Sequence, residues 1–300
     1  MFLQQLINGL TLGSVYALIA LGYTMVYGIL QLINFAHGEI YMIGAYLAII
    51  VLGVLTATGF SATNLPLAIL LAFIVSGIFC GAYGLTLERV AYRPLRHAHR
   101  LSPLISAIGM SIFLQNYVML SQGAVDKVFP HIIPTKGIDI AGASISYLQI
   151  FILVASFILM IALHLFIKKT RLGKAMRATS QDSRMASLVG IDSDKVIAVT
   201  FVIGSMLAAA AGVMVAMYYG VVNFFIGYTA GIKAFTAAVL GGIGNIPGAM
   251  LGGLLLGLVE GLGASYISSE YKDVFAFTIL ILVLIFRPTG LLGERIGEKV

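Results

Sequence analysis

The stretch LINGLTLGSVYALIALGYTMVYGIL at residues 6–30 decides the fold, because it is long, apolar and free of charged side chains. A run of about 20 apolar residues crosses the hydrocarbon core of a bilayer as an α-helix. Inside a bilayer the backbone polar groups must be hydrogen-bonded within the protein, which favours a helix. The alternating ten-residue segments of a transmembrane β-barrel do not occur in the chain. We therefore predict a transmembrane helix over 6–30.

Further apolar runs follow the first along most of the chain. Of the 300 residues, 60% are hydrophobic and only 10% are charged, and 34 are glycine. Soluble domains carry about 25% charged residues, so too few charges remain here to cover a water-exposed surface. We expect an all-α integral membrane protein of about 8–9 transmembrane helices, forming one domain over residues 1–300 without a cleavable signal peptide. The other predicted spans are 39–55, 65–87, 101–120, 148–167, 196–218, 227–240, 247–264 and 274–286.

Most basic residues gather in three regions beside apolar runs. Short loops rich in Lys and Arg face the cytoplasm, so we place all three there and the loop 122–147 outside. About nine crossings put the N-terminus outside, whereas a first run that crosses twice, or a re-entrant second run, puts it inside. The basic regions comprise Arg89, Arg93, Arg96 and Arg100, then Lys168, Lys169, Arg171, Lys174, Arg177, Arg184 and Lys195, and finally Arg287, Arg295 and Lys299.

A polar break, LINFAHGE at 32–39, separates the first two runs. Asn34 is a good cap for a following helix, and the helix dipole would favour Glu39 as an anion in its first turn. One interpretation is a polar turn at a membrane face. The other is a discontinuous helix whose residues Asn34, His37, Gly38 and Glu39 line a translocation pathway.

A second break, GGIGNIPG at 241–248, precedes the eighth run. Asn245 is a plausible helix cap, Pro247 is tolerated in the first helical turn, and Gly244 adds to the interruption. Paired breaks in the two halves of a transporter indicate the translocation path, so we expect a weak two-fold repeat of about 1–125 and 148–300. Glycines spaced by four let helices pack closely, and this packing is expected of Gly244, Gly248 and Gly252 and of Gly253, Gly257 and Gly261.

Lys233 and Glu260 are charged residues within apolar runs. Such residues usually face the interior of a bundle or a wet cavity. Lys233 could also extend to the outer surface, and Glu260 could be interfacial. The alternatives of a structural pair and a pathway role stay open.

The cytoplasmic stretch 168–195 is too long for a tight turn. Residues 184–188 are predicted to form a short helix that ends at Gly190. Such a helix suits docking to a cytoplasmic partner, although an ordinary connecting loop has the same spacing.

Enzymatic motifs are missing from the sequence. It contains no G-x-x-x-x-G-K-[ST] phosphate loop, no H-E-x-x-H and no G-x-S-x-G, so we expect no catalytic residues, cofactor or metal. The basic residues lie beside spans without interleaved aromatic residues, which argues against nucleic-acid binding. Cys80 is the only cysteine, so no disulfide forms within the chain. A transporter subunit, a self-sufficient secondary transporter and a channel remain.

Five segments resemble branched-chain amino acid ABC importer permeases of the LivH type. The segment 34–39 matches that family's signature break, and 170–178 with Ala186, Gly190 and Ile191 matches its coupling region. The resemblance covers essentially the whole chain. The matching segments are NGLTLGSVYAL at 8–18, NFAHGE at 34–39, TRLGKAMRA at 170–178, GGIGNIPGA at 241–249 and FRPTGL at 286–291.

The resemblance implies a multi-pass permease in the bacterial inner membrane. Its expected partners are a paralogous LivM-like permease, two cytoplasmic ATPases and a periplasmic amino-acid-binding protein, besides membrane lipid. ATPase coupling is expected at Arg184, Ala186, Gly190 and Ile191. The general coupling signature E-A-A-x-x-x-G is matched only at Ala186 and Gly190. The expected substrates are leucine, isoleucine and valine, and related permeases carry urea, amides or other amino acids.

Overall fold

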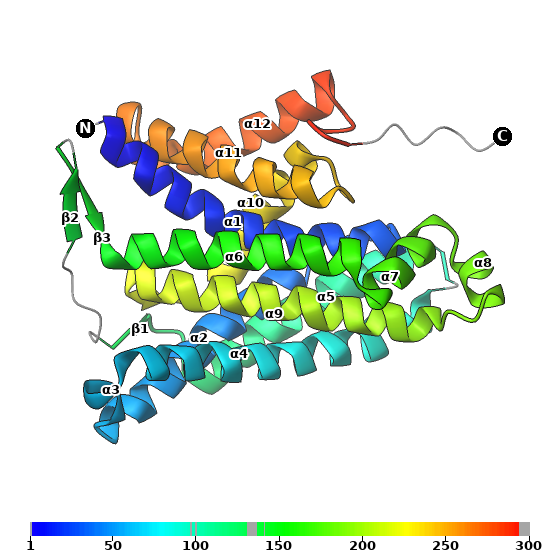
Figure 1. The fold of residues 1–300 in the computed structure, drawn as a ribbon, viewed down its shortest axis with the longest axis horizontal. Helices are drawn as coiled ribbons and strands as arrows, with labels where there is room; N and C mark the ends of the chain where they lie inside the picture. The colour runs from blue at the N-terminus through cyan, green and yellow to red at the C-terminus, as the bar shows by residue number, and fades with distance from the viewer. Residues whose placement is uncertain (1, 97, 100, 131–136, 141, 294–300) are drawn as a thin grey trace.

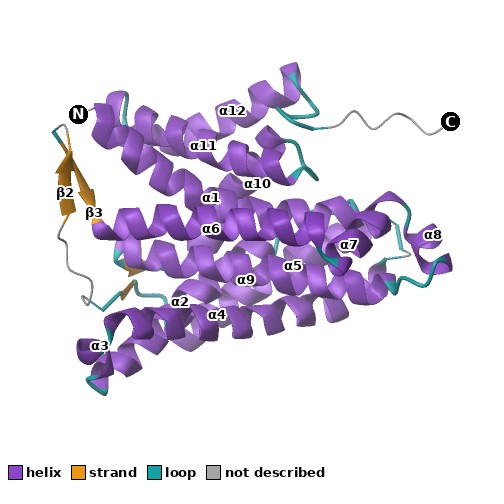
Figure 2. Cartoon of the chain, in the orientation of Figure 1, coloured by secondary structure: helices purple, strands orange, loops and turns teal. Residues whose placement is uncertain are grey.

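The computed structural model describes residues 2–96, 98–99, 101–130, 137–140 and 142–293. Of the basic residues named above, Arg100, Arg295 and Lys299 lie outside the described residues. The described chain is almost entirely helical (Figure 2), as the apolar runs predicted.

Among the described residues, seven helices are long and apolar enough to cross a membrane, and α10 is a shorter apolar helix. These helices confirm the all-α membrane fold. The long helices are α1 (Phe2–Leu30), α2 (His37–Ala57), α4 (Leu65–Leu87), α5 (Leu101–Gln122), α6 (Tyr147–Lys169), α9 (Ser193–Tyr219) and α11 (Ile246–Tyr266). The others are α3 (Phe60–Thr63), η1 (Glu88–Tyr92), η2 (Arg93–Leu95), α7 (Arg171–Gln181), α8 (Ser183–Leu188), α10 (Ile226–Gly241), η3 (Ser269–Tyr271) and α12 (Lys272–Phe286).

Two short strand pairs, which the sequence analysis did not predict, connect helix ends. Strand β1 (Lys127–Val128) pairs with β4 (Val221–Val222), and β2 (Gly137–Ile140) pairs with β3 (Ala143–Ser146), both antiparallel. Figure 1 shows these strands and α3 at one end of the bundle, with α7 and α8 at the opposite end.

The N-terminal end of α1 lies at the strand end of the bundle. The backbone N–H of Ser144 in β3 donates to the side-chain oxygen of Gln4, 2.8 Å away. The basic α7–α8 region lies at the other end (Figure 1), which the positive-inside rule assigns to the cytoplasm. The N-terminal end of α1 and the basic α7–α8 region therefore lie at opposite ends of the bundle.

Helices α1 and α11 pack closely along a row of glycines. A Cβ atom at Gly257 or Gly253 would overlap the backbone of α1 at Gly13 or Ala17. The opposite side of α11 meets α10, where a Cβ at Gly252 would overlap the backbone of Ala237. The glycines at 248, 252, 257 and 261 therefore pack α11 against two neighbours, as their spacing predicted.

We expect Gly257→Ala to lower the thermal unfolding midpoint of the purified protein. The added methyl group has no space against Gly13, and overpacking costs about 1–3 kcal/mol. Gly109→Ala in α5 is the control, because nothing lies within 4 Å of the position of its Cβ. Equal midpoints for the two variants would show that the α1–α11 contact is not tight.

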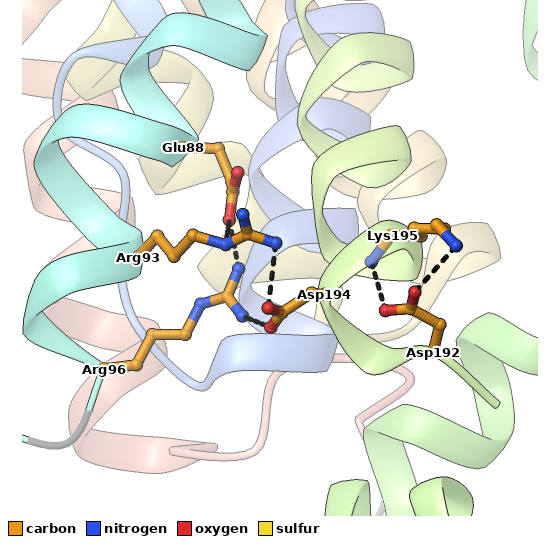
Figure 3. A network of polar contacts seen from close by, with 6 residues as sticks. All are labelled: Glu88, Arg93, Arg96, Asp192, Asp194 and Lys195. Carbon is orange, nitrogen blue, oxygen red and sulfur yellow. Dashed lines mark hydrogen bonds and ion pairs between the residues drawn. The ribbon is translucent and has the colours of Figure 1, made fainter. Parts of the chain in front are cut away.

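An ion-pair network ties the cytoplasmic end of α4 to the start of α9 (Figure 3). Buried Glu88 in η1 pairs with Arg96, and the Arg93 Nε atom lies 3.8 Å from the same carboxylate oxygen. Asp194 in α9 pairs with Arg93 at 2.8 Å and with Arg96 at 2.5 Å. Arg93 and Arg96, assigned only a topological role from the sequence, therefore also connect two helices.

Asp192 and Lys195 form a separate, exposed pair beside this network, 3.0 Å apart (Figure 3). The hydrogen bonds from the side chain and backbone N–H of Lys195 lower the pKa of Asp192 below its usual value. The backbone bond, at 3.1 Å, also caps the first turn of α9.

Arg96→Ala is expected to destabilise the protein strongly. Removing one partner of a buried ion pair costs about 3–5 kcal/mol, and here it leaves buried Glu88 with only the more distant Arg93, whose Nε atom is 3.8 Å away. The double variant Glu88→Gln/Arg96→Ala removes that stranded charge and should regain most of the lost thermal stability in detergent. A double variant no more stable than Arg96→Ala would contradict the pairing.

Candidate translocation pathway

The first polar break lies where α2 begins, inside the helix bundle. The chain leaves α1 at Leu30 and becomes helical again only at His37, whose ring lies against Gly22 in the middle of α1. The His37 ring also meets Tyr23 edge-on, with ring centroids 4.9 Å apart. The break therefore leads from the end of α1 back into the bundle, where α2 begins.

Asn34 organises the break but does not cap α2. Its Oδ1 atom accepts a hydrogen bond from the Ala36 N–H at 3.1 Å and one from the Tyr92 hydroxyl at 3.0 Å. The residue at the cap position is Ala36, which makes no side-chain cap bond. Asn34 therefore forms a two-residue turn anchored to η1, instead of the predicted helix cap.

Helix α10 begins directly beside the start of α2. A Cβ at Gly38 would overlap Gly227 and Gly231 of α10, so the two backbones touch at glycines. Asn223 makes the same turn before α10 that Asn34 makes before α2, because its Oδ1 accepts from the Phe225 N–H at 3.0 Å. Sequence reasoning missed this segment, although VNFFIG at 222–227 matches INFAHG at 33–38 in its Asn-Phe-x-x-Gly pattern.

The predicted second break lies elsewhere, at the junction of α10, α11 and the C-terminal segment. Asn245 caps α11 as expected, since its Oδ1 accepts from the Gly248 N–H at 2.9 Å. Its Nδ2 atom donates to the Leu292 carbonyl at 2.8 Å. Gly244 adopts a positive φ of 95°, and Pro247 lies in the first turn of α11. The break at 32–39 therefore contacts 222–227, a segment that the sequence analysis did not pair with it.

Glu39 lies in the first turn of α2 at the junction with α10. Its side chain is buried, with Oε1 accepting a hydrogen bond from the Ser111 hydroxyl of α5 at 3.0 Å. The Oε2 atom lies against Gly227 and has no hydrogen-bond partner among the described residues. An ionisable carboxyl group is thus held where α2 and α10 begin side by side.

A cavity of about 500 Å³ lies between α5 and α10 beside this junction. Its wall is largely apolar and aromatic, with a serine hydroxyl and a glutamine amide, and this combination is typical of small-molecule sites. The cavity is lined by Tyr23, Phe35, Ile108, Ser111, Ile112, Gln115, Phe225, Gly227, Tyr228, Gly231 and Ile232.

Lys233 and Glu260 form a buried ion pair with a 2.7 Å N–O distance. Tyr16 donates to the second oxygen of Glu260 at 2.9 Å, and Asp273 lies 2.6 Å from the Lys233 Nζ atom. The pair borders a second cavity of about 350 Å³. Thr229 and Lys233, on one face of α10, line this cavity. Lys233 is therefore neutralised inside the bundle and does not extend to the surface.

The predicted coupling region forms two helices, α7 and α8, at the cytoplasmic end. Ala186 is buried and its carbonyl accepts from the Ile191 N–H at 3.0 Å, while Gly190 ends the helix with a φ of 86°. Arg184 is exposed. Three neighbouring apolar side chains are also exposed: Met185 (63%), Leu188 (80%) and Val189 (77%).

No group of three His, Cys, Asp or Glu side chains in the described part of the chain could hold a metal ion.

The chain is similar to known transport proteins over its full length. The family model described as "Branched-chain amino acid transport system / permease component" matches residues 5–284. The high-affinity branched-chain amino acid transport system permease protein BraD of Pseudomonas aeruginosa is 58% identical, over 100% of this chain and 98% of that protein. The LivH protein of Escherichia coli K12, described in the same words, is 54% identical with the same coverage.

A more distant relative has a different described task. The autoinducer 2 import system permease protein LsrD of Escherichia coli O9:H4 is 26% identical, over 84% of this chain and 76% of that protein. The match of the family model to most of the chain, together with the full-length relatives, shows that the chain belongs to the family of branched-chain amino acid transport system permease components.

Proposed function

We propose that this chain is the permease subunit of an ATP-driven, high-affinity importer of leucine, isoleucine and valine in the bacterial inner membrane. The observation that carries the proposal is the full-length identity of 54–58% to permeases described as transporting branched-chain amino acids. The largely apolar cavity beside the α2–α10 junction supports it, because an aliphatic side chain gains free energy on leaving water for such a wall.

The translocation pathway in this proposal runs past the α2–α10 junction. Asn34, His37, Gly38 and Glu39 shape the start of α2, and Ser111 with Gln115 supplies polar groups on the opposite wall. The cavity opens between α5 and α10, where Ile112 and Tyr228 are exposed. A paralogous LivM-like permease would cover this opening and complete the path.

Five further residues named from the sequence have structural contacts that support the path indirectly. Lys233 and Glu260 hold α10 against α11 beside the second cavity, and Gly244, Asn245 and Pro247 shape the turn between these helices. We propose that they position α10 and do not touch the substrate at the first cavity.

One of the two cytoplasmic ATPases would dock at α8, and a periplasmic binding protein would deliver the amino acid at the strand end of the bundle. The exposed apolar side chains of α8 support the ATPase contact, because a helix surrounded by water gains by covering such a patch. Arg184, Ala186, Gly190 and Ile191 would set the shape of this contact.

The substrate assignment is tested by labelled-leucine uptake in a strain that lacks this gene, with and without the gene restored. We expect uptake to be lost and then recovered, and to require ATP. Unchanged leucine uptake together with lost urea uptake would show that the permease carries urea instead of leucine. Transport by the isolated chain in liposomes, driven by an ion gradient alone, would favour a secondary transporter instead.

Leu188→Gln is expected to reduce co-purification of the ATPases and leucine uptake by about tenfold, because a desolvated apolar anchor contributes about 1–2 kcal/mol to an interface. The matched control is Leu172→Gln in α7, which is also exposed but lies outside α8. Both variants should insert in the membrane normally. Equal losses for the two substitutions would argue against α8 as the contact.

A further inference from the structure

We propose that the Glu39 carboxylate binds the ammonium group of the amino acid as it passes the α2–α10 junction. This inference rests on the proposed function and adds the group that distinguishes an α-amino acid from an uncharged amide or urea.

The carboxylate of Glu39 has one oxygen without a partner. The residue is 1% exposed, and of its two oxygens only Oε1 is hydrogen-bonded, to Ser111. In the described part of the chain, no Lys or Arg side chain forms an ion pair with it. Burying a polar group without a partner costs about 1–3 kcal/mol, so a native protein keeps such an oxygen for a reason.

Glu39 lies at two helix N-termini, which offset part of the cost of burying its charge. It lies in the first turn of α2, and its Oε2 atom lies against Gly227 in the first turn of α10. Each helix N-terminus carries a partial positive charge of about half a unit. Two such termini stabilise one carboxylate, and the resulting anion has one oxygen left to accept a hydrogen bond from a cation.

Ser111 and Gly227 connect Glu39 to the cavity. Each of them touches one oxygen of the carboxylate, and both also line the 500 Å³ cavity. Only a hydroxyl and a glycine therefore stand between the carboxylate and the space for the substrate. A Cβ at Gly227 would lie 2.5 Å from Oε2, so a glycine is required here for the Glu39 carboxylate to lie this close to α10.

A zwitterion fits both charges of this junction. Its ammonium group would reach Glu39 Oε2, its carboxylate would meet free N–H groups in the first turn of α10, and its side chain would lie among Phe35, Phe225 and Tyr228. An uncharged amide could donate an N–H hydrogen bond to the carboxylate but would form no ion pair with it. The cavity thus combines an apolar wall with a buried anion, as recognition of an apolar α-amino acid requires.

The test uses the complete transporter, this permease with its partner subunits, in liposomes with leucine-loaded binding protein. Leucine transport and ATP hydrolysis are measured together. Glu39→Gln retains an oxygen that accepts from Ser111 but removes the charge. We expect the leucine transported per ATP to fall by about tenfold or more, as loss of a charge-assisted hydrogen bond predicts, while stimulated ATP hydrolysis stays within about twofold of wild type.

Glu39→Asp is the second variant, because it keeps the charge on a shorter side chain. We expect it to transport more leucine per ATP than Glu39→Gln. Wild-type transport by Glu39→Gln, equal loss of transport and hydrolysis in an assembled complex, or an Asp variant no better than the Gln variant would overturn the role of Glu39. Wild-type complexes that hydrolyse ATP without moving leucine would instead refute the proposed function.

Discussion

The contact of Gly38 with Gly227 and Gly231 is the constraint on which the centre of the molecule depends. Two interrupted helices start at this contact, and each start leaves backbone N–H groups without helical partners. In a membrane, irregular backbone is tolerated only where it is buried in protein or lines a cavity. The Asn34 and Asn223 side chains satisfy one N–H group each, and the cavity between α5 and α10 lies directly beside the junction.

The same junction is connected to the cytoplasmic end of the molecule by a series of direct contacts. The Tyr92 hydroxyl bonds to Asn34, and Tyr92 belongs to the η1 turn that also holds Glu88. From there Arg93 and Arg96 reach Asp194 at the start of α9, and α9 follows α8 in the chain. A displacement of α8 by a docked ATPase would therefore act on helices that touch the break.

Much of the fold could be predicted from the sequence because bilayer physics acts locally. The apolar runs corresponded to helices, and Asn245 capped α11 because a cap needs only residues three positions apart. The glycine spacing of α11 predicted close packing, although not which helices would pack. Asp194 was not recognised as a partner of Arg93 and Arg96, since residues about a hundred positions apart meet only in the folded chain. Glu88 lies only eight positions before Arg96, but the apolar run that ends beside it gave no sign of an ion pair.

The candidate site was predicted only in its first half. Asn34, His37, Gly38 and Glu39 were chosen because polar residues interrupt an apolar run. The segment 222–227 contains a single polar residue and was not recognised, and only its last residue, Gly227, began a predicted span. The segment 241–248 was chosen as the counterpart of 32–39 because it contains glycine and proline. In the structure these residues lie at the turn between α10 and α11. Comparing the two Asn-Phe-x-x-Gly segments would have found the correct partner.

The most direct test of the path is the water accessibility of the cavity wall. In a variant with Cys80→Ala, single cysteines at Gln115 and at Ile78 would be exposed to a membrane-impermeant thiol reagent in the assembled, transporting complex. Gln115 lines the cavity and Ile78 lies on the outer face of α4. The account predicts that Gln115→Cys reacts and is protected by leucine during turnover, while Ile78→Cys stays unreactive. Equal inertness at both positions would contradict a path beside the α2–α10 junction.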